Sequence, residues 1–311
     1  MHAIPTFAPA SPQAHALTTL FEGVLIVLGA IFLLVTGLVI FMIVRYRDRP
    51  GAPEARQIFG STALEVVWTL IPLGILAVFS VFMMFADSAA DPPIPDGRKP
   101  DLEVVGHQWW WEINYPGSGV VAANEIHIPV GKQILIELKS ADVIHDFWVP
   151  ELGGKIDAVP GHPNTLWIEA DAPGTYLGSC GEFCGAEHTW MRFRVIAQSE
   201  ADFDAWQRAQ LVVPATPSAP EALAGERLFT DKTCVNCHAI AGTVANQLIG
   251  PDLTHLASRE MLAGEAAKNT PAELYKWLKN PNAIKPASHM PNFKLSDAEA
   301  HQLVAYLEGL K

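Results

Sequence analysis

Two long apolar runs dominate the hydrophobic pattern near the start of the chain. Gly23 to Val44 is an uncharged run of 22 residues, and Val66 to Ala86 is a second run of 21 residues. A helix needs about 20 consecutive apolar residues to cross a bilayer. A buried helix of a soluble protein is the alternative, but two such runs in tandem argue against it. We therefore expect residues 23–86 to form a transmembrane helical hairpin.

The basic residues around these runs predict the orientation of the hairpin. Residues 1–22 contain no Lys or Arg, and so lack the basic start of a signal peptide. The segment between the runs carries Arg45, Arg47, Arg49 and Arg56. Because basic residues concentrate in cytoplasmic loops, we expect this segment in the cytoplasm. Residues 1–22, as an N-terminal tail, and everything after Asp87 are then extracytoplasmic.

After a linker rich in Pro and Asp at residues 87–100, the pattern changes to short runs of β type. These runs are Leu102–Val105, Glu125–Ile128, Gln133–Leu138, Leu166–Glu169 and Met191–Val195. Gly and Pro separate them, and this spacing is typical of a β-sandwich or barrel. A polar, helical stretch from Ala197 to Gln210 closes the predicted domain, which spans residues 101–210.

The last part of the chain has a helical pattern. Residues 211–219 are rich in Pro and small residues, which predicts a semi-rigid linker. Helical segments follow at Pro220–Phe229, Pro271–Leu278 and Ser296–Leu310. Residues 220–311 therefore form a predicted all-α domain of ordinary size.

The net charge and the cysteine spacing limit which partners and which kinds of site the chain can have. The formal net charge is -12, which argues against nucleic acid and favours a partner with a basic face. The four cysteines form two tight pairs, Cys180 with Cys184 and Cys234 with Cys237. Such pairs are more typical of metal or cofactor chemistry than of a disulfide framework.

The first cysteine pair lies in a segment crowded with soft and borderline metal ligands, the donors that select copper over magnesium or calcium. The donor side chains are Cys180, Cys184, His188 and Met191, with His145 upstream. A mononuclear blue-copper site needs one thiolate, so the second one predicts two bridged copper ions, with the Glu182 carbonyl as a further ligand. The alternatives are zinc, which gives Met191 no role, and a Cys180–Cys184 disulfide, which leaves the His and Met spacing unexplained.

The second cysteine pair fits the C-x-x-C-H motif for covalent haem attachment. The thiols of Cys234 and Cys237 add to the haem vinyl groups, and the imidazole of His238 binds the iron. A zinc or dithiol site is the alternative for the pentapeptide alone. A methionine as sixth ligand raises the potential, and Met290, in a loop before the last predicted helix, is the candidate. The competing residues are His289 and His255 as ligands, and Met261, which we expect in the core.

The pattern C-x-E-x-C-x-x-x-H-x-x-M resembles the binuclear copper (CuA) loop of cytochrome c oxidase subunit II. The C-terminal domain resembles class I cytochromes c, so the whole chain resembles a caa3-type subunit II with a fused cytochrome c domain. This resemblance implies a cupredoxin-like fold for residues 101–210, with an immunoglobulin-like sandwich as the runner-up. It implies the copper ligands His145, Cys180, Glu182 (through its carbonyl), Cys184, His188 and Met191.

The resemblance also implies a role for the first of three adjacent tryptophans. Trp109 matches the exposed aromatic residue, near the copper, that receives electrons from cytochrome c. In a strand, Trp109 and Trp111 would share one face and Trp110 would take the other.

Further residues gain expected roles from the same resemblance. Glu65, at the cytoplasmic end of the second apolar run, matches the glutamate at the entrance of a proton-uptake pathway; a solvated flank residue is the alternative. The Glu182 carboxylate is implied in a magnesium site shared with subunit I. The Pro251 carbonyl is implied in orienting His238.

These implications describe subunit II of a haem–copper terminal oxidase, located in a bacterial-type inner membrane. Electrons would reach the haem on His238 and Met290, pass to the copper pair, and move to subunit I, where oxygen is reduced to water with proton pumping. The two apolar runs contain no histidine, so the oxygen chemistry belongs to a partner chain. The expected partners are subunit I, further oxidase subunits, and cytochrome c or another electron donor.

Two rival functions remain at this stage. One is the electron-accepting subunit of a copper-containing nitric oxide reductase, against which the cytochrome fusion and Glu65 argue. The other is a copper-delivery or assembly protein, which would have little use for covalent haem. The complete set of copper ligands argues against the quinol-oxidising relatives of subunit II.

Overall fold

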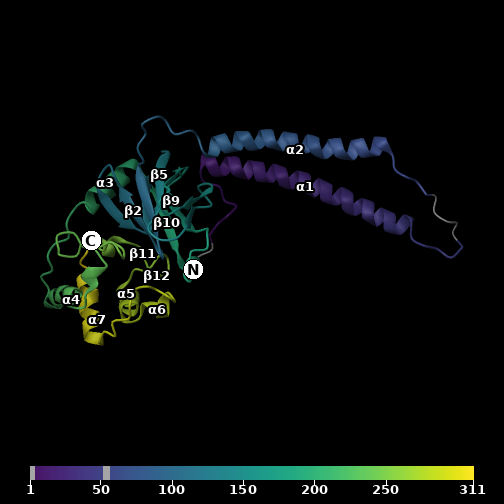
Figure 1. Ribbon diagram of the computed structural model, residues 1–311. Helices are drawn as coiled ribbons and strands as arrows, with labels where there is room; N and C mark the ends of the chain where they lie inside the picture. The colour runs from purple at the N-terminus through teal and green to yellow at the C-terminus, as the bar shows by residue number, and fades with distance from the viewer. Residues whose placement is uncertain (1–3, 52–56) are drawn as a thin grey trace. The chain divides into compact units, whose positions relative to one another are not determined.

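The computed structural model describes residues 4–51 and 57–311, which fall into two compact units. One unit spans His15–Pro93, and the other combines the residues up to Ala14 with Ile94–Lys311 (Figure 1). Arg56, one of the arginines expected in the cytoplasmic loop, lies outside the described residues.

The first unit is a pair of long helices. Helix α1 spans Pro12–Arg45 and helix α2 spans Thr62–Ala90, with 34 and 29 residues. At 1.5 Å per residue both helices exceed about 40 Å, enough to cross a bilayer. Their apolar windows are not buried inside the protein, as lipid-facing surface requires. Both expected apolar helices are therefore present.

Helix α1 begins earlier than the apolar run, inside the predicted N-terminal tail. Ser11 is the reason: its hydroxyl accepts a hydrogen bond from the Ala14 N–H at 3.0 Å and donates one to the Leu152 carbonyl at 2.8 Å. A Ser cap followed by Pro at the first helical position is a strong helix start. Residues 12–22 of the predicted tail are therefore helical.

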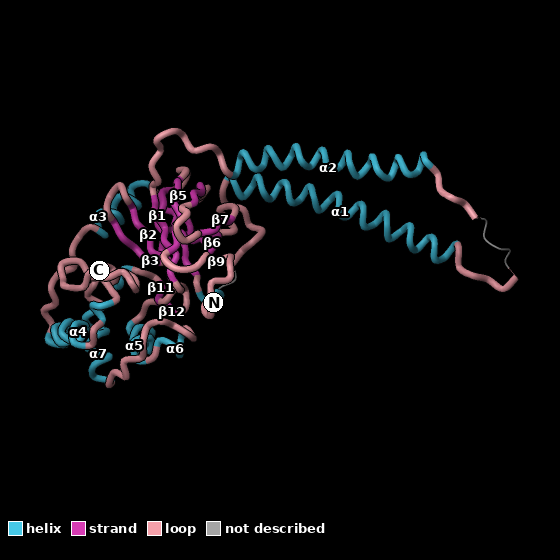
Figure 2. Tube along the Cα trace, viewed as in Figure 1, coloured by secondary structure: helices cyan, strands magenta, loops and turns pink. Residues whose placement is uncertain are grey.

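Residues 102–198 form a sandwich of two five-stranded sheets, here called the β-domain (Figure 2). The first sheet has the order β3-β2-β1-β5-β8, and the second has the order β4-β10-β9-β6-β7. The strands are β1 Leu102–His107, β2 Trp110–Tyr115, β3 Val120–Ala123, β4 Glu125–Pro129, β5 Ile134–Ser140, β6 His145–Trp148, β7 Lys155–Ala158, β8 Asn164–Ile168, β9 Gly174–Cys180 and β10 Arg192–Gln198. All five predicted β-runs overlap strands of this sandwich.

Each sheet contains a parallel strand pair: β1 with β5 in the first sheet, and β4 with β10 in the second. The centre of the sandwich is aromatic: Trp111 packs on Phe147 at 5.7 Å and on Phe193 at 5.5 Å between ring centroids. This topology, with a His at the start of β6 and a ligand-rich loop between β9 and β10, confirms the cupredoxin-like fold. Helix α3, Glu200–Gln210, follows the last strand and is capped by Ser199.

The C-terminal module, residues 220–311, is mainly helical. Its helices are α4 Pro220–Asp231, α5 Pro271–Lys279, α6 Pro281–Ile284 and α7 Asp297–Leu307. Helices α4 and α7 cross closely at Gly225, where an added Cβ would lie 2.0 Å from the Gln302 carbonyl oxygen. The module also contains a short hairpin, β11 Met261–Leu262 with β12 Ala267–Lys268, which the helical pattern did not predict.

Candidate metal centres

The residues predicted to bind copper lie at one end of the second sheet. His145 is the first residue of β6, Cys180 is the last residue of β9, and Met191 directly precedes β10. Strand β9 pairs with both β6 and β10. This pairing brings His145 beside the segment 180–191, which we call the ligand loop, across 35 residues of sequence.

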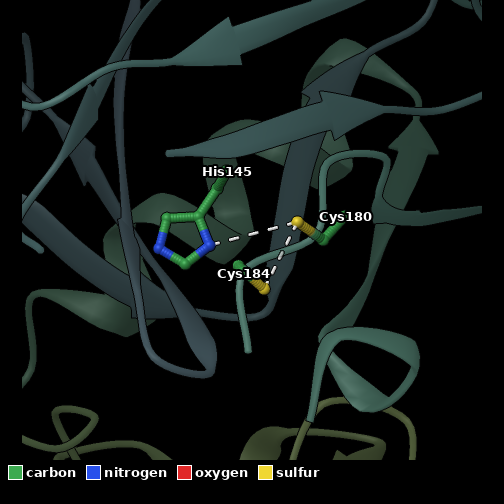
Figure 3. A group of neighbouring side chains, drawn as sticks. All are labelled: His145, Cys180 and Cys184. Carbon is green, nitrogen blue, oxygen red and sulfur yellow. Dashed lines mark hydrogen bonds between the residues drawn. The ribbon is translucent and has the colours of Figure 1, made fainter. Parts of the chain in front are cut away.

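The predicted donor atoms converge around the two thiols. His145 Nδ1 lies 4.0 Å from Cys180 Sγ, which lies 3.7 Å from Cys184 Sγ. Figure 3 shows the three side chains directed toward one another. The sulfur separation is far longer than the roughly 2 Å of a disulfide, so the pair is not cross-linked. The remaining donors approach the thiols as follows: Glu182 carbonyl to Cys180 Sγ 3.2 Å, His188 Nδ1 to Cys184 Sγ 3.7 Å, and Met191 Sδ to Cys184 Sγ 3.7 Å.

The protonation of the cysteine pair fits a cationic ligand. The hydrogen bond between the two thiols, opposed by burial, lowers the pKa of Cys180 well below that of a free thiol. The same interaction, together with burial, raises the pKa of Cys184. The first thiolate therefore forms readily and the second requires a positive charge nearby, which bound metal ions supply.

His145 is fully buried and held with one nitrogen facing the thiols. Its Nε2 contacts Asp142 Oδ1 at 2.8 Å, so a proton on Nε2 leaves the Nδ1 lone pair directed toward Cys180. Burial opposes protonation, but hydrogen bonds to Cys180 and Asp142 outweigh it and raise the pKa of His145. A carboxylate behind a histidine is the usual way in which a protein fixes a metal-ligating tautomer. The donor set and its orientation thus fit copper.

Trp109 is joined to the ligand loop by a hydrogen bond. Its indole N–H donates to the Cys184 carbonyl at 3.0 Å, and Gln108 Nε2 donates to the same oxygen at 2.7 Å. Gly185, with φ +118, permits this approach, because a Cβ there would lie 3.0 Å from the indole. Two donors on one carbonyl fix the backbone directly after Cys184, between the predicted ligands Cys184 and His188.

The expected exposure of Trp109 was wrong. Strand β2 begins only at Trp110, so Trp109 lies in the turn before it, yet Trp109 and Trp111 both pack in the core of the β-domain. Trp109 is only 8% exposed. Its ring contacts the ring of His289, in the C-terminal module, at 4.5 Å between centroids. The fused module therefore covers the aromatic residue that the sequence suggested would be exposed.

In the haem motif, the His238 ring lies close against the backbone of Gly250 and Pro251. Cys234 opens a short 3-10 turn, and His238 directly follows Cys237. The His238 Nδ1–H donates to the Pro251 carbonyl at 2.7 Å, which leaves Nε2 available for iron. At Gly250 a Cβ would lie 2.6 Å from His238 Cε1, so only glycine permits this approach. The proline contact implied by the resemblance is present.

The competing axial ligands are engaged elsewhere. His255 Nε2 donates to the Gln210 carbonyl at 2.8 Å, and the His289 ring packs on Trp109. Met290 is partly buried against the core of the C-terminal module. Met261, expected in the core, lies instead in β11, where its N–H donates to Glu125 of the β-domain at 3.0 Å. The geometry favours Met290 among these residues.

The C-terminal module docks on the β-domain through polar contacts that sequence reasoning missed. Arg194 of β10 forms a paired hydrogen bond with Glu265, at 2.6 and 2.7 Å. At the ligand loop, Lys285 donates to the Trp109 carbonyl at 2.7 Å and lies 3.2 Å from Glu187. No local pattern marks such residues, because their partners are distant in sequence.

The two remaining predicted residues lie apart from these centres. Glu65 is in the first turn of α2, in the separate helical unit, and is exposed. The Glu182 side chain is also exposed, while its carbonyl faces Cys180. Its carboxylate is therefore accessible to a partner subunit.

Comparison with known proteins covers almost the whole chain. Residues 5–85 match the family described as "Cytochrome C oxidase subunit II, transmembrane domain". Residues 118–198 match "Cytochrome C oxidase subunit II, periplasmic domain", and residues 222–311 match "Cytochrome c".

Individual relatives agree with these matches. The chain is 36% identical to cytochrome c oxidase subunit 2 of Alkalihalophilus pseudofirmus over 310 residues, covering 97% of this chain and 90% of that protein. It is 32% identical to the Bacillus subtilis protein of the same name over 291 residues, covering 87% and 82%. Among solved structures, the periplasmic domain of subunit II of cytochrome oxidase from Bradyrhizobium japonicum is 31% identical, with a TM-score of 0.35, over 36% of this chain and 95% of that one.

Proposed function

The chain belongs to the family of cytochrome c oxidase subunit II, in the form with a C-terminal cytochrome c domain, and on that premise we propose that it relays electrons between two centres of its own. Family membership makes it a membrane-anchored part of an oxidoreductase complex, with subunit I and other oxidase subunits as partners. It also implies copper in the β-domain and haem in the C-terminal module.

We assign the copper pair to the donors grouped around the ligand loop, and the haem to Cys234, Cys237, His238 and Met290. When bound, these groups supply one-electron redox chemistry, with the haem accepting electrons from a donor and the copper pair passing them to subunit I for proton-coupled oxygen reduction. The protein orients them: Asp142 holds His145, and Pro251 holds His238. Partners of this kind fix the tautomer and the ring orientation of a histidine that would bind a metal.

One observation carries this proposal: Trp109 touches both metal-binding regions. Its indole N–H reaches the Cys184 carbonyl, and its ring contacts His289, the neighbour of Met290. We propose that Trp109 is the residue through which electrons enter the β-domain. The donor to the C-terminal module is cytochrome c or another small electron carrier.

Electron paramagnetic resonance of the full chain with haem and copper tests the copper assignment. We expect a hyperfine pattern of one electron shared equally by two copper nuclei, and its loss in Cys184→Ser. A spectrum of one isolated copper in the parent chain would overturn the assignment.

Substitution of two neighbouring tryptophans tests the role of Trp109. After rapid photoreduction of the haem, Trp109→Phe should slow reduction of the copper, because the hydrogen bond to Cys184 is lost. Trp110→Phe is the matched control, since Trp110 is equally buried but stacks on His107. Equal rates in the two variants would contradict the role.

We also propose that Glu65 stands at a proton entrance and that the Glu182 carboxylate binds magnesium with subunit I. The arginines after α1 favour a cytoplasmic connecting loop in a bacterial inner membrane, with the metal centres on the other side. Glu65→Gln should lower proton uptake by the oxidase, whereas Glu22→Gln, at the opposite side of the hairpin, should not. Unchanged proton uptake in Glu65→Gln would contradict the proposed proton entrance at Glu65.

A further inference from the structure

A buried lysine joins the two metal-binding loops. The side chains of Lys285 and Glu187 are 5% and 2% exposed, and Lys285 Nζ lies 3.2 Å from Glu187 Oε2. The same ammonium donates to the Trp109 carbonyl at 2.7 Å. Burying a charged pair is costly, and such pairs serve best where they specify one arrangement over others.

The sequence positions of the pair explain why its arrangement matters. Glu187 lies in the ligand loop between Cys184 and His188, and Lys285 lies between α6 and Met290. Each partner therefore belongs to a segment that carries predicted metal ligands, one in the β-domain and one in the C-terminal module.

Two hydrogen bonds within the segment link the position of Lys285 to that of Met290. The Ser288 N–H donates to the Lys285 carbonyl at 3.2 Å, and the Met290 N–H donates to the Ser288 hydroxyl at 3.3 Å. His289, between them and the β-domain, packs on Trp109. Fixing Lys285 therefore fixes the segment 285–290, which we call the Met290 loop, against the ligand loop.

We propose that Lys285 is a positioning residue that, through Glu187 and the Trp109 carbonyl, holds the Met290 loop in the arrangement that transfers electrons. This inference rests on the proposed function and deepens it. The step that it serves moves one electron from the reduced haem iron to the oxidised copper pair, and no covalent bond forms or breaks. The Arg194–Glu265 contact holds the other side of the interface independently.

The matched variants are Lys285→Met and Lys276→Met in the intact oxidase. Lys276 is 61% exposed and pairs only within its own helix, with Glu273, so its removal should leave the interface unchanged. In Lys285→Met we expect amide hydrogen exchange in residues 285–290 and 185–188 to rise, and electron transfer from haem to copper to slow, each by at least about tenfold. The optical and resonance spectra of both centres should stay as in the parent.

Lys285→Met with unchanged exchange and unchanged transfer overturns the proposal. Loss of either metal centre in that variant also overturns it, because Lys285 would then build a site instead of positioning one. The double variant Lys285→Met/Glu187→Gln removes the unpaired buried carboxylate and so protects against misfolding; it should still transfer slowly, and a parental rate would refute the role. If the parent oxidase itself passes no electron from haem to copper, the proposed function fails, while the exchange comparison still tests the interface.

Discussion

Gly106→Ala is a sharp test of the copper geometry. Gly106 lies in β1 directly beside the His145 ring, and an added Cβ would lie 2.6 Å from Cδ2 and 3.0 Å from Cγ of that ring. Non-bonded carbons are comfortable at about 3.5–4.0 Å, so the ring must move by roughly 1 Å. His145 is fully buried and tied to Asp142, so it has little room to do so.

The size of the effect follows from two separate costs. Overpacking a buried site costs about 1–3 kcal/mol of the free energy of unfolding. Metal sites tolerate ligand displacements of only about 0.2 Å, so a shift of roughly 1 Å exceeds the tolerance several-fold. Disturbing the support of a metal-ligating histidine typically lowers affinity about 10–100-fold, and we expect a loss in this range for copper.

Copper content after equilibration at fixed free copper, together with thermal unfolding of the copper-free chain, measures both costs. Gly117→Ala is the control, because Gly117 has no atom within 4 Å of an added Cβ and no positive φ. The reasoning is refuted if Gly106→Ala binds copper as tightly as Gly117→Ala and keeps the same hyperfine pattern.

Three other predictions follow from the same structure. Gly250→Ala places a Cβ 2.6 Å from His238, so we expect altered axial ligation in the haem spectrum with unchanged copper content; an unaltered haem spectrum would contradict this. Burial, partly offset by a hydrogen bond to Gln198, lowers the pKa of His127 to about 4. The unfolded chain therefore takes up the proton first: stability is complete above about pH 6.5 and falls by up to about 3 kcal/mol as the pH drops to about 4. Denaturant titrations should show this loss in the parent and a smaller loss in His127→Gln. Because the hydrogen bond with Cys184 lowers the pKa of Cys180 and raises that of Cys184, alkylation of the copper-free chain should speed up less between pH 6 and pH 8 at Cys180 than at Cys184, with copper protecting both.

The sequence predicted the features that depend on residues close together in the chain. Apolar runs predicted α1 and α2, alternating runs predicted the β-domain, and the resemblance grouped His145 with the ligand loop, beside which it lies in the structure. Ser11 moved the start of α1, because one side-chain cap outweighed the hydropathy boundary. The resemblance gave the wrong exposure for Trp109, because His289 of the C-terminal module packs on its ring.

Contacts between distant segments could not be predicted in this way. Asp142 has a local signal, three residues before His145, but Lys285 and Trp109 are separated by 176 residues. In the sequence, nothing distinguishes Glu187 from an ordinary loop carboxylate. It is buried because the C-terminal module covers it. Their pairing depends on how two folded parts meet, which no periodicity within either part encodes.

The covering of Trp109 has a consequence for how the oxidase is supplied. A soluble donor protein cannot reach an indole that is 8% exposed beneath His289, so under the proposed function electrons would have to pass through the docked module. The tether of residues 211–219 replaces an encounter between two molecules with a contact at an effective concentration of about millimolar. Under the proposed function, the transfer step from haem to copper would then not depend on donor concentration or on salt, whereas the loading of the haem would. Under the proposed function, the fused module would then act as a one-electron reservoir that stays attached to the enzyme.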